Sequence, residues 1–299
     1  CKELLDKPAD VILMNGFEDN FVPKGATFTN KCKRARSAML NVANKLLGTD
    51  WGDDTLIIGT SGRYEFKNKG IDVFLESLNR LSRDKNLKKN VLAFINVPGW
   101  VGEPRADLQE RLKSKNQFDT PLEVPYITHW LHNMSHDQVL DTMKYLDMAN
   151  RPQDKVKVIF VPCYLDGKDG IFNKEYYDVI LGQDLSVYAS YYEPWGYTPL
   201  ESVAFRVPTI TTDLAGFGLW VKSLKNQNGL DDGVEVIHRS DYNYSEVADE
   251  IKDTVSAYSG KTAKEIETIR KRAAAVAEQA LWKHFIQYYY EAYDIALRN

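Results

Sequence analysis

Short apolar runs rich in β-branched residues recur along the middle of the chain, separated by stretches with helical spacing. Runs that are apolar at nearly every position are typical of strands buried on both faces. Strands that alternate with helices are typical of a parallel sheet, so the pattern predicts an α/β fold with flanking helices. The predicted strands are Leu56–Thr60, Val91–Val97, Val156–Val161, Leu185–Ala189, Thr209–Thr212 and Val234–Ile237.

The clearest helical pattern follows the first strand, where apolar residues recur along one face of a helix. These residues are Ile71, Phe74, Leu75, Leu78 and Leu81. Further helices are expected over Glu175–Leu181, Pro199–Phe205 and Ser245–Tyr258. Ahead of Pro199–Phe205, Thr198 and Glu201 have the spacing of N-cap and N3, which predicts a capping box.

The two ends differ from this middle part. A basic helix is expected over about residues 26–48, ending at Gly48, and residues 263–299 predict one long helix, rich first in alanine and then in aromatic residues. The segment Pro98–Pro125 is charged and bounded by proline, which favours a peripheral insertion.

Composition narrows the class of protein. The chain has 299 residues, 43% hydrophobic and 27% charged, which are ordinary globular values. Its formal net charge of −4 gives no overall basic field for nucleic acid or an anionic membrane, and no apolar run is long enough for a membrane span. Cys1, Cys32 and Cys163 form no C-x-x-C pair, which favours a cytoplasmic location. The first residues do not have the pattern of a signal peptide. Because the chain lacks an initiator Met, we expect a piece of a longer protein.

The first candidate site is GTSGRYEFKNKG, residues 59–70, between a predicted strand and a predicted helix. Ligands gather at the carboxyl ends of strands in open parallel sheets, and the start of a helix offers unpaired N–H groups to an anion. Arg63 and Lys69 lie six residues apart, so two cations can converge on one phosphate there. A solvated, lysine-rich turn explains the same residues equally well.

The second candidate site is SYYEPWGYTP, residues 190–199. Glu193, Trp195 and Gly196 place a carboxylate, a large ring and a flexible backbone just before an electropositive helix end. This arrangement suits sugar binding or the stabilisation of a developing positive charge. The alternative is a surface acid beside a structural tryptophan.

Other motifs exclude more than they support. The glycines at 216 and 218 lack the third glycine of a dinucleotide fingerprint, since Val221 stands there, and this disfavours a dehydrogenase. No Asp-x-Asp and no G-x-S-x-G occurs, so we expect no metal-chelated diphosphate and no serine hydrolase chemistry. His129, His132 and His136 have helical spacing and could share a zinc ion, but polar surface residues are the simpler interpretation.

Several longer motifs together resemble the C-terminal half of glycogen synthase of the animal and fungal type, glycosyltransferase family 3. They are GRYEFKNKG (62–70), VKVIF (156–160), SYYEPWGYTP (190–199) and ITTDLAGFG (210–218). The resemblance implies the Rossmann-like, donor-binding C-terminal domain of a two-domain GT-B enzyme whose N-terminal domain is missing. It divides the chain into an interdomain crossover segment with the basic helix (1–50), a nucleotide-sugar-binding domain (51–260) and a C-terminal helical segment (261–299).

The same resemblance implies a reaction: retaining transfer of glucose from UDP-glucose to the 4-hydroxyl of a glycogen chain, without a metal or other cofactor. Arg63 and Lys69 would hold the donor diphosphate, and Glu193 would lie beside the reacting glucose. Tyr176, with Tyr177 as a rival, would stack on uracil. The remaining implied donor-site residues are Trp195, Gly196, Tyr197 and Thr198.

Two departures from the family pattern change the expectations. The short Pro98–Pro125 stretch replaces a long helical insertion, so the family's oligomeric state does not carry over. Arg270 and Arg272 remain from an arginine cluster that binds glucose 6-phosphate, but Ala275 stands where another arginine is expected, and we therefore expect no strong activation. Two alternatives stay open: a non-catalytic sugar-nucleotide- or glycan-binding module, and another retaining GT-B glycosyltransferase.

Overall fold

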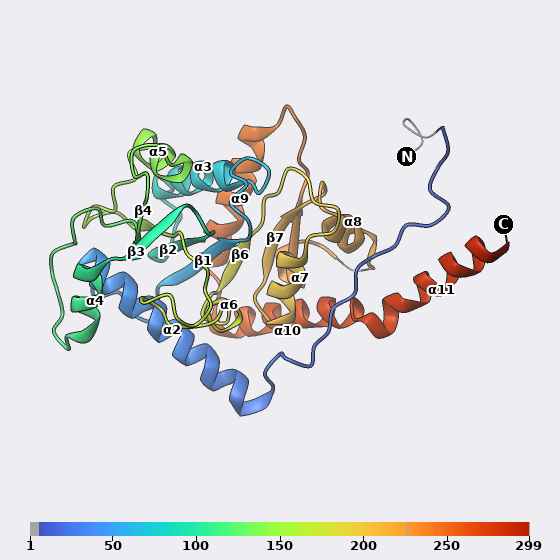
Figure 1. Ribbon diagram of the computed structural model, residues 1–299, viewed down its shortest axis with the longest axis horizontal. Helices are drawn as coiled ribbons and strands as arrows, with labels where there is room; N and C mark the ends of the chain where they lie inside the picture. The colour runs from blue at the N-terminus through green and yellow to red at the C-terminus, as the bar shows by residue number, and fades with distance from the viewer. Residues whose placement is uncertain (1–5, 226, 299) are drawn as a thin grey trace.

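The computed structural model describes residues 6–225 and 227–298 and is built around one parallel sheet of six strands (Figure 1). The strand order is β5-β2-β1-β6-β7-β8. All six predicted strands are confirmed, because their apolar runs fill the middle layer of the domain. Their bounds are β1 Leu56–Ser61, β2 Val91–Asn96, β5 Val156–Val161, β6 Leu185–Val187, β7 Thr209–Thr212 and β8 Val234–Ile237.

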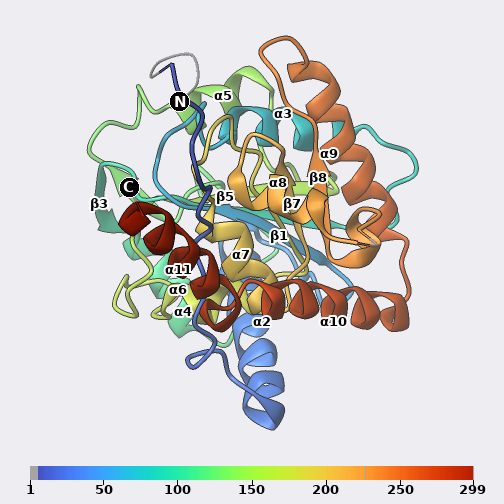
Figure 2. The same ribbon diagram turned by 90° about the vertical axis from the view of Figure 1, so that its right-hand side faces the viewer.

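Helices cover both faces of the sheet, as the two views show (Figures 1 and 2). One face carries α3 (Ile71–Ser82), α5 (Gln138–Tyr145) and α9 (Tyr244–Ser259), whose apolar faces pack on the sheet in one cluster. The opposite face carries α2 (Gly25–Leu47), α4 (Ala106–Lys113), α6 (Tyr176–Ile180), α7 (Tyr197–Ala204) and α10 (Ala263–Gln279). The short α8 (Gly216–Ser223) follows β7.

The basic helix α2 ends as predicted, because Gly48 adopts the left-handed conformation of a helix C-cap, with φ of 61°. The segment Pro98–Pro125 contains β3 (Val101–Pro104), which pairs with β4 (His129–Leu131) in a separate two-stranded sheet, and α4. Arg105 within this segment is fully buried, and its guanidinium donates to the carbonyls of Glu123 and Val124 at 2.6 Å each. The buried Arg105 therefore joins the first part of the segment to its last residues by hydrogen bonds.

The capping box predicted at Thr198 is wrong. Helix α7 begins at Tyr197, its N-cap is Gly196 with φ of 101°, and no side chain caps it. Glu201 instead accepts a hydrogen bond from the Tyr177 hydroxyl at 2.9 Å. Because glycine reaches this left-handed conformation without strain, the helix starts earlier and leaves its first N–H groups uncapped by side chains.

The single C-terminal helix predicted from residue 263 is divided into α10 and α11 (Trp282–Arg298). The break lies where Phe17 pairs with Leu281: the Phe17 N–H donates to the Ala280 carbonyl at 2.9 Å, and the Trp282 N–H donates to the Phe17 carbonyl at 3.1 Å. Figure 2 shows the N-terminal segment passing beside α11. In the described ranges, every helix is too short or too polar to cross a bilayer.

Candidate active site

A cavity of about 360 Å³ opens at the carboxyl ends of β1, β2 and β5. Ser61 and Asn96 end β1 and β2 in register, so both side chains reach this edge of the sheet. The walls come from three loops, which follow β1, β2 and β5, and from the starts of α6 and α7. The lining residues are Ser61, Gly62, Arg63, Asn96, Pro98, Cys163, Tyr164, Leu165, Asp166, Tyr176 and Thr198.

Both predicted cations lie close to Gly62. Arg63 lines the cavity, with 76% of its side chain exposed, and its Nη1 is 3.0 Å from Glu65 Oε1. Lys69 is mostly buried, and a Cβ placed on Gly62 would lie 3.9 Å from its Cε and 4.0 Å from the Thr198 methyl. Burial, and then the charge of Arg63, lowers the pKa of Lys69. The two positive charges therefore act on the same region beside Gly62 and Thr198.

Lys69 forms an ion pair with Glu193, which we call the Lys69–Glu193 pair. Backbone hydrogen bonds fix the loop that carries the carboxylate: the Glu193 N–H donates to Leu214 O at 3.2 Å, and the Gly216 N–H donates to Glu193 O at 3.1 Å. The Tyr191 N–H donates to Asn68 O at 2.7 Å and so ties this loop to the loop of Lys69. The structure thus brings together two motifs that are more than a hundred residues apart in the sequence.

Helix α7 starts beside the cavity. Thr198 lines it, Gly196 precedes the helix in the left-handed conformation, and the side chain of Tyr197 is largely exposed. Because no side chain caps this helix start, its amide groups and its positive dipole end are available to an anion there.

Tyr176 and Tyr177 face different surroundings. Tyr176 lines the cavity, and its hydroxyl lies 2.9 Å from Ser61 Oγ. Tyr177 stacks on Phe205 with ring centroids 5.0 Å apart and donates its hydroxyl to Glu201. Of the two rings, that of Tyr176 is placed to meet a ligand in the cavity.

Trp195 lies in the hydrophobic core, contrary to its prediction as a donor-site residue. Only 6% of its surface is exposed, and its ring contacts those of Phe217, Trp220 and Phe285. Apolar residues of α8 and α11 bury the ring, and this packing fixes the loop between Glu193 and α7.

Asn96 is a site residue that the sequence patterns did not indicate. Only 6% of it is exposed, it lines the cavity, and neither its amide nitrogen nor its amide oxygen has a hydrogen-bond partner among the described residues. A buried polar group without a partner costs roughly 1–3 kcal/mol. The usable signal was its position as the one polar residue in VLAFIN, at the carboxyl end of a buried strand.

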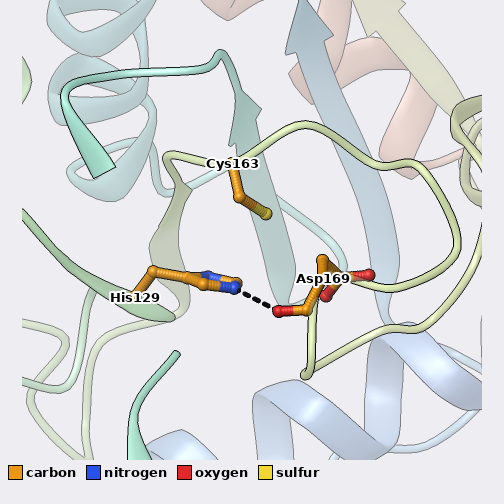
Figure 3. Close-up of side chains that lie close together, drawn as sticks. All are labelled: His129, Cys163 and Asp169. Atoms are coloured by element: carbon orange, nitrogen blue, oxygen red, sulfur yellow. Dashed lines mark hydrogen bonds between the residues drawn. The ribbon is translucent and has the colours of Figure 1, made fainter. Parts of the chain in front are cut away.

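The three histidines do not share a helix face. His129 lies in β4 and is buried, close to Cys163 and Asp169 (Figure 3). Its Nε2–H donates to the Asp169 carbonyl at 2.8 Å, and its Nδ1 accepts from Thr128 Oγ1 at 2.9 Å. Burial lowers the pKa of His129 and raises that of Cys163 to about 12. Since both ring nitrogens are engaged and the thiol stays protonated, this cluster forms a hydrogen-bonded joint between β4 and the loop after β5.

Arg270 and Arg272 do not converge on one site. Arg270 donates to Gln183 O at 2.8 Å and lies 3.2 Å from Asp184 Oδ1, whereas Arg272 lies 3.1 Å from Asp232 Oδ1. Residues two apart on a helix point in different directions, so these arginines tie α10 to two separate segments of the domain. Each guanidinium therefore has a carboxylate partner of its own, and the two arginines that remain from the family's regulatory cluster are held apart.

Comparison with known proteins agrees with this architecture. The family model described as glycogen synthase matches residues 2–103 and 105–299. The chain is 28% identical to the glycogen [starch] synthase of Neurospora crassa over 83% of its own length and 42% of the relative's. It is 29% identical to isoform 2 of Saccharomyces cerevisiae, covering 83% of this chain and 44% of that protein. The liver enzyme of Homo sapiens is 26% identical, covering 82% and 42%.

Solved structures of glycosyltransferases share the fold. HepE of Anabaena, in complex with UDP and glucose, has a TM-score of 0.53 at 14% identity, over 96% of this chain and 56% of that one. WaaG, from lipopolysaccharide biosynthesis, has a TM-score of 0.52 at 13% identity, over 96% and 57%. The domain thus has the fold of one half of a GT-B glycosyltransferase. The chain spans less than half the length of the curated relatives, and it belongs to the glycogen synthase family, of which it represents the C-terminal half.

Proposed function

We propose that this chain is the donor-binding half of a glycogen (starch) synthase, which transfers glucose from UDP-glucose to the 4-hydroxyl of a growing α-1,4-glucan with retention. The observation that carries the proposal is the Lys69–Glu193 pair, whose lysine lies close to Gly62 in the wall of the cavity that Arg63, Tyr176 and Thr198 also line. HepE, a protein of the same fold, binds UDP and glucose. The acceptor groove would belong to the N-terminal half of the enzyme.

The residues of this chain suit the chemistry of sugar transfer. The bond between the sugar's anomeric carbon and the diphosphate oxygen breaks, negative charge grows on the diphosphate, and positive charge grows on the sugar ring. In our proposal Arg63, Lys69 and the first amides of α7 stabilise the departing diphosphate, while Glu193 lies beside the positive ring. Fixed charges in a partly buried site act most strongly on charge that develops in the transition state. The acceptor's hydroxyl oxygen forms the new bond to the anomeric carbon and gives up its proton to the departing diphosphate oxygen.

Calorimetric titration of this chain with UDP, ADP and GDP tests the donor site. We expect UDP to bind, with the same affinity in Mg²⁺ and in EDTA, because side-chain cations take the role of a metal at the diphosphate. Absence of binding by all three nucleotides would refute the donor site. UDP binding combined with no glucosyl transfer by the full-length protein would instead favour the non-catalytic binding module.

Replacing the unpartnered Asn96 separates stability from binding. Asn96→Leu is expected to raise the melting temperature, because the change removes a buried amide that has no hydrogen-bond partner. The same change should weaken UDP binding about tenfold, since the lost amide is a donor and an acceptor inside the cavity. Thermal melts with and without UDP measure both effects, and an unchanged UDP affinity would remove Asn96 from the site.

Glucose 6-phosphate is expected to leave the activity of the full-length protein nearly unchanged. The guanidinium groups of Arg270 and Arg272 already bind carboxylates on different segments, and Ala275 supplies no third cation. A phosphate would have to displace those partners. Titration of glucosyl transfer with glucose 6-phosphate checks this, and strong stimulation would contradict it.

A further inference from the structure

A second cavity, of about 510 Å³, lies beside the Lys69–Glu193 pair, and we propose that it is a binding subsite for the glucan. We call it the tyrosine cavity, after Tyr191 and Tyr244 in its wall. Its volume lies within the range of about 300–1,000 Å³ that is usual for small-molecule sites. This inference extends the proposed function by adding a place for the neutral sugar chain.

The position of the tyrosine cavity follows from two loops already described. Asn68 lines it and directly precedes Lys69, and Tyr191 lines it two residues before Glu193. We call the 360 Å³ cavity of the proposed donor site the nucleotide cavity. Its lining residues come from the loops after β1, β2 and β5 and from the starts of α6 and α7. The two cavities have no lining residue in common. Lys69 therefore lies between Asn68 of the tyrosine cavity and Gly62 of the nucleotide cavity, so a glucan bound in the tyrosine cavity would lie near the donor site.

The charges in the tyrosine cavity balance, which favours a neutral ligand. Lys67 and Arg239 supply two positive charges, and Asp72 and Asp241 supply two negative ones. Arg239 is buried and donates to the Ala189 carbonyl, so its charge is already partly compensated. A cavity with no excess of either sign gains little from an ionic ligand but offers hydrogen-bond donors and acceptors to hydroxyl groups.

Two features of the cavity point to a sugar in particular. Asp72 lines the cavity, and its Oδ1 is buried without a hydrogen-bond partner among the described residues. This oxygen is therefore free to accept a hydrogen bond from a sugar hydroxyl. Tyr191 and Tyr244 are 39% and 42% exposed, and Arg239 lies 5.4 Å from the Tyr191 ring centroid and supports that ring. Half-exposed rings beside carboxylate and amide groups provide an apolar surface and polar contacts for one sugar ring.

Native electrophoresis of this chain in gels that contain glycogen tests the inference. We expect glycogen to retard the wild-type chain and Tyr244→Ala to lose at least about tenfold in apparent affinity, the scale of one lost aromatic contact. Tyr242→Ala is the matched control, because Tyr242 is 92% exposed, lies two residues away and does not line the cavity. A second variant, Asp241→Ala, should weaken binding in the same direction, and melting temperatures identify any variant that fails to fold.

The outcomes separate this inference from the donor site. Tyr244→Ala should bind UDP with unchanged affinity in the calorimeter, because Tyr244 is not in the nucleotide cavity. No retardation of the wild-type chain, or equal losses for Tyr244→Ala and Tyr242→Ala, would overturn the glucan subsite and leave the donor site standing. Retardation by glycogen without any UDP binding would keep the subsite and refute the donor site.

Discussion

Lys69→Ala in the full-length protein is expected to lower kcat by about 100- to 1,000-fold, the usual loss when one fixed charge or donor is removed from a transition state. Lys69 is mostly buried, its pKa is lowered by that burial, and it pairs with Glu193 close to Gly62, which lines the proposed donor site. Its charge is therefore weakly screened, and its removal leaves Glu193 without its cation. Steady-state glucosyl transfer from UDP-glucose measures the loss.

Two further variants keep this result interpretable. Lys69→Met has nearly the same length without the charge and should lose as much kcat as Lys69→Ala, whereas a purely spatial role predicts that methionine restores activity. Lys85→Ala removes an exposed lysine outside both cavities and should leave kcat unchanged. Wild-type turnover in Lys69→Ala would take this residue out of the mechanism.

Gly70→Ala is expected to destabilise the fold by about 3 kcal/mol or more, which lies in the upper part of the range for single substitutions. Gly70 has φ of 68°, and a Cβ there would collide with the Ala189 carbonyl and lie 2.8 Å from Arg239 Nη1. The left-handed conformation is itself unfavourable for alanine, and the clash is with backbone atoms, so it can be relieved only if the backbone moves. Because Gly70 lets the start of α3 approach the end of β6, the change should also move Lys69 away from Glu193.

Urea unfolding followed by circular dichroism measures this loss of stability. Gly52→Ala is the matched control, because a Cβ on Gly52 meets only Asp54 Oδ1, at 3.8 Å, and should change stability by less than about 0.5 kcal/mol. If Gly70→Ala and Gly52→Ala are equally stable, the backbone around Ala189 can move enough to accommodate the Cβ, and the prediction is wrong.

The layered sheet could be predicted because its strands are apolar at nearly every position, and only strands between two helical layers need that pattern. The break between α10 and α11 could not. The helical spacing around Ala280 gives no sign of a break. The break depends on hydrogen bonds between the backbone of Phe17, more than two hundred residues earlier, and that of Ala280 and Trp282. Such long-range pairing overrides local helix propensity.

The sequence motifs were enough to predict which residues form the candidate site, but not which of them pair with one another. Arg63, Lys69 and Glu193 could be named from loops that follow strands, yet the sequence could not show that Lys69 would pair with Glu193 while Arg63 pairs with Glu65. Trp195 was assigned to the site because loop aromatics often bind ligands, whereas here α8 and α11 bury its ring. Asn96 had only a weak signal, its place as the last, polar residue of an apolar strand, and the tyrosine cavity depends on tertiary neighbours alone.

The joint at Phe17 has a mechanical consequence. Hydrogen bonds in both directions lock Phe17 to Ala280 and Trp282, and the Trp282 side chain presses against Gly16. Residues 16–17 and the start of α11 are therefore held together, so a displacement of one would be passed to the other. Because Phe285 of α11 packs on Trp195, two residues after Glu193, the same contacts would carry such a displacement to the loop that bears this carboxylate.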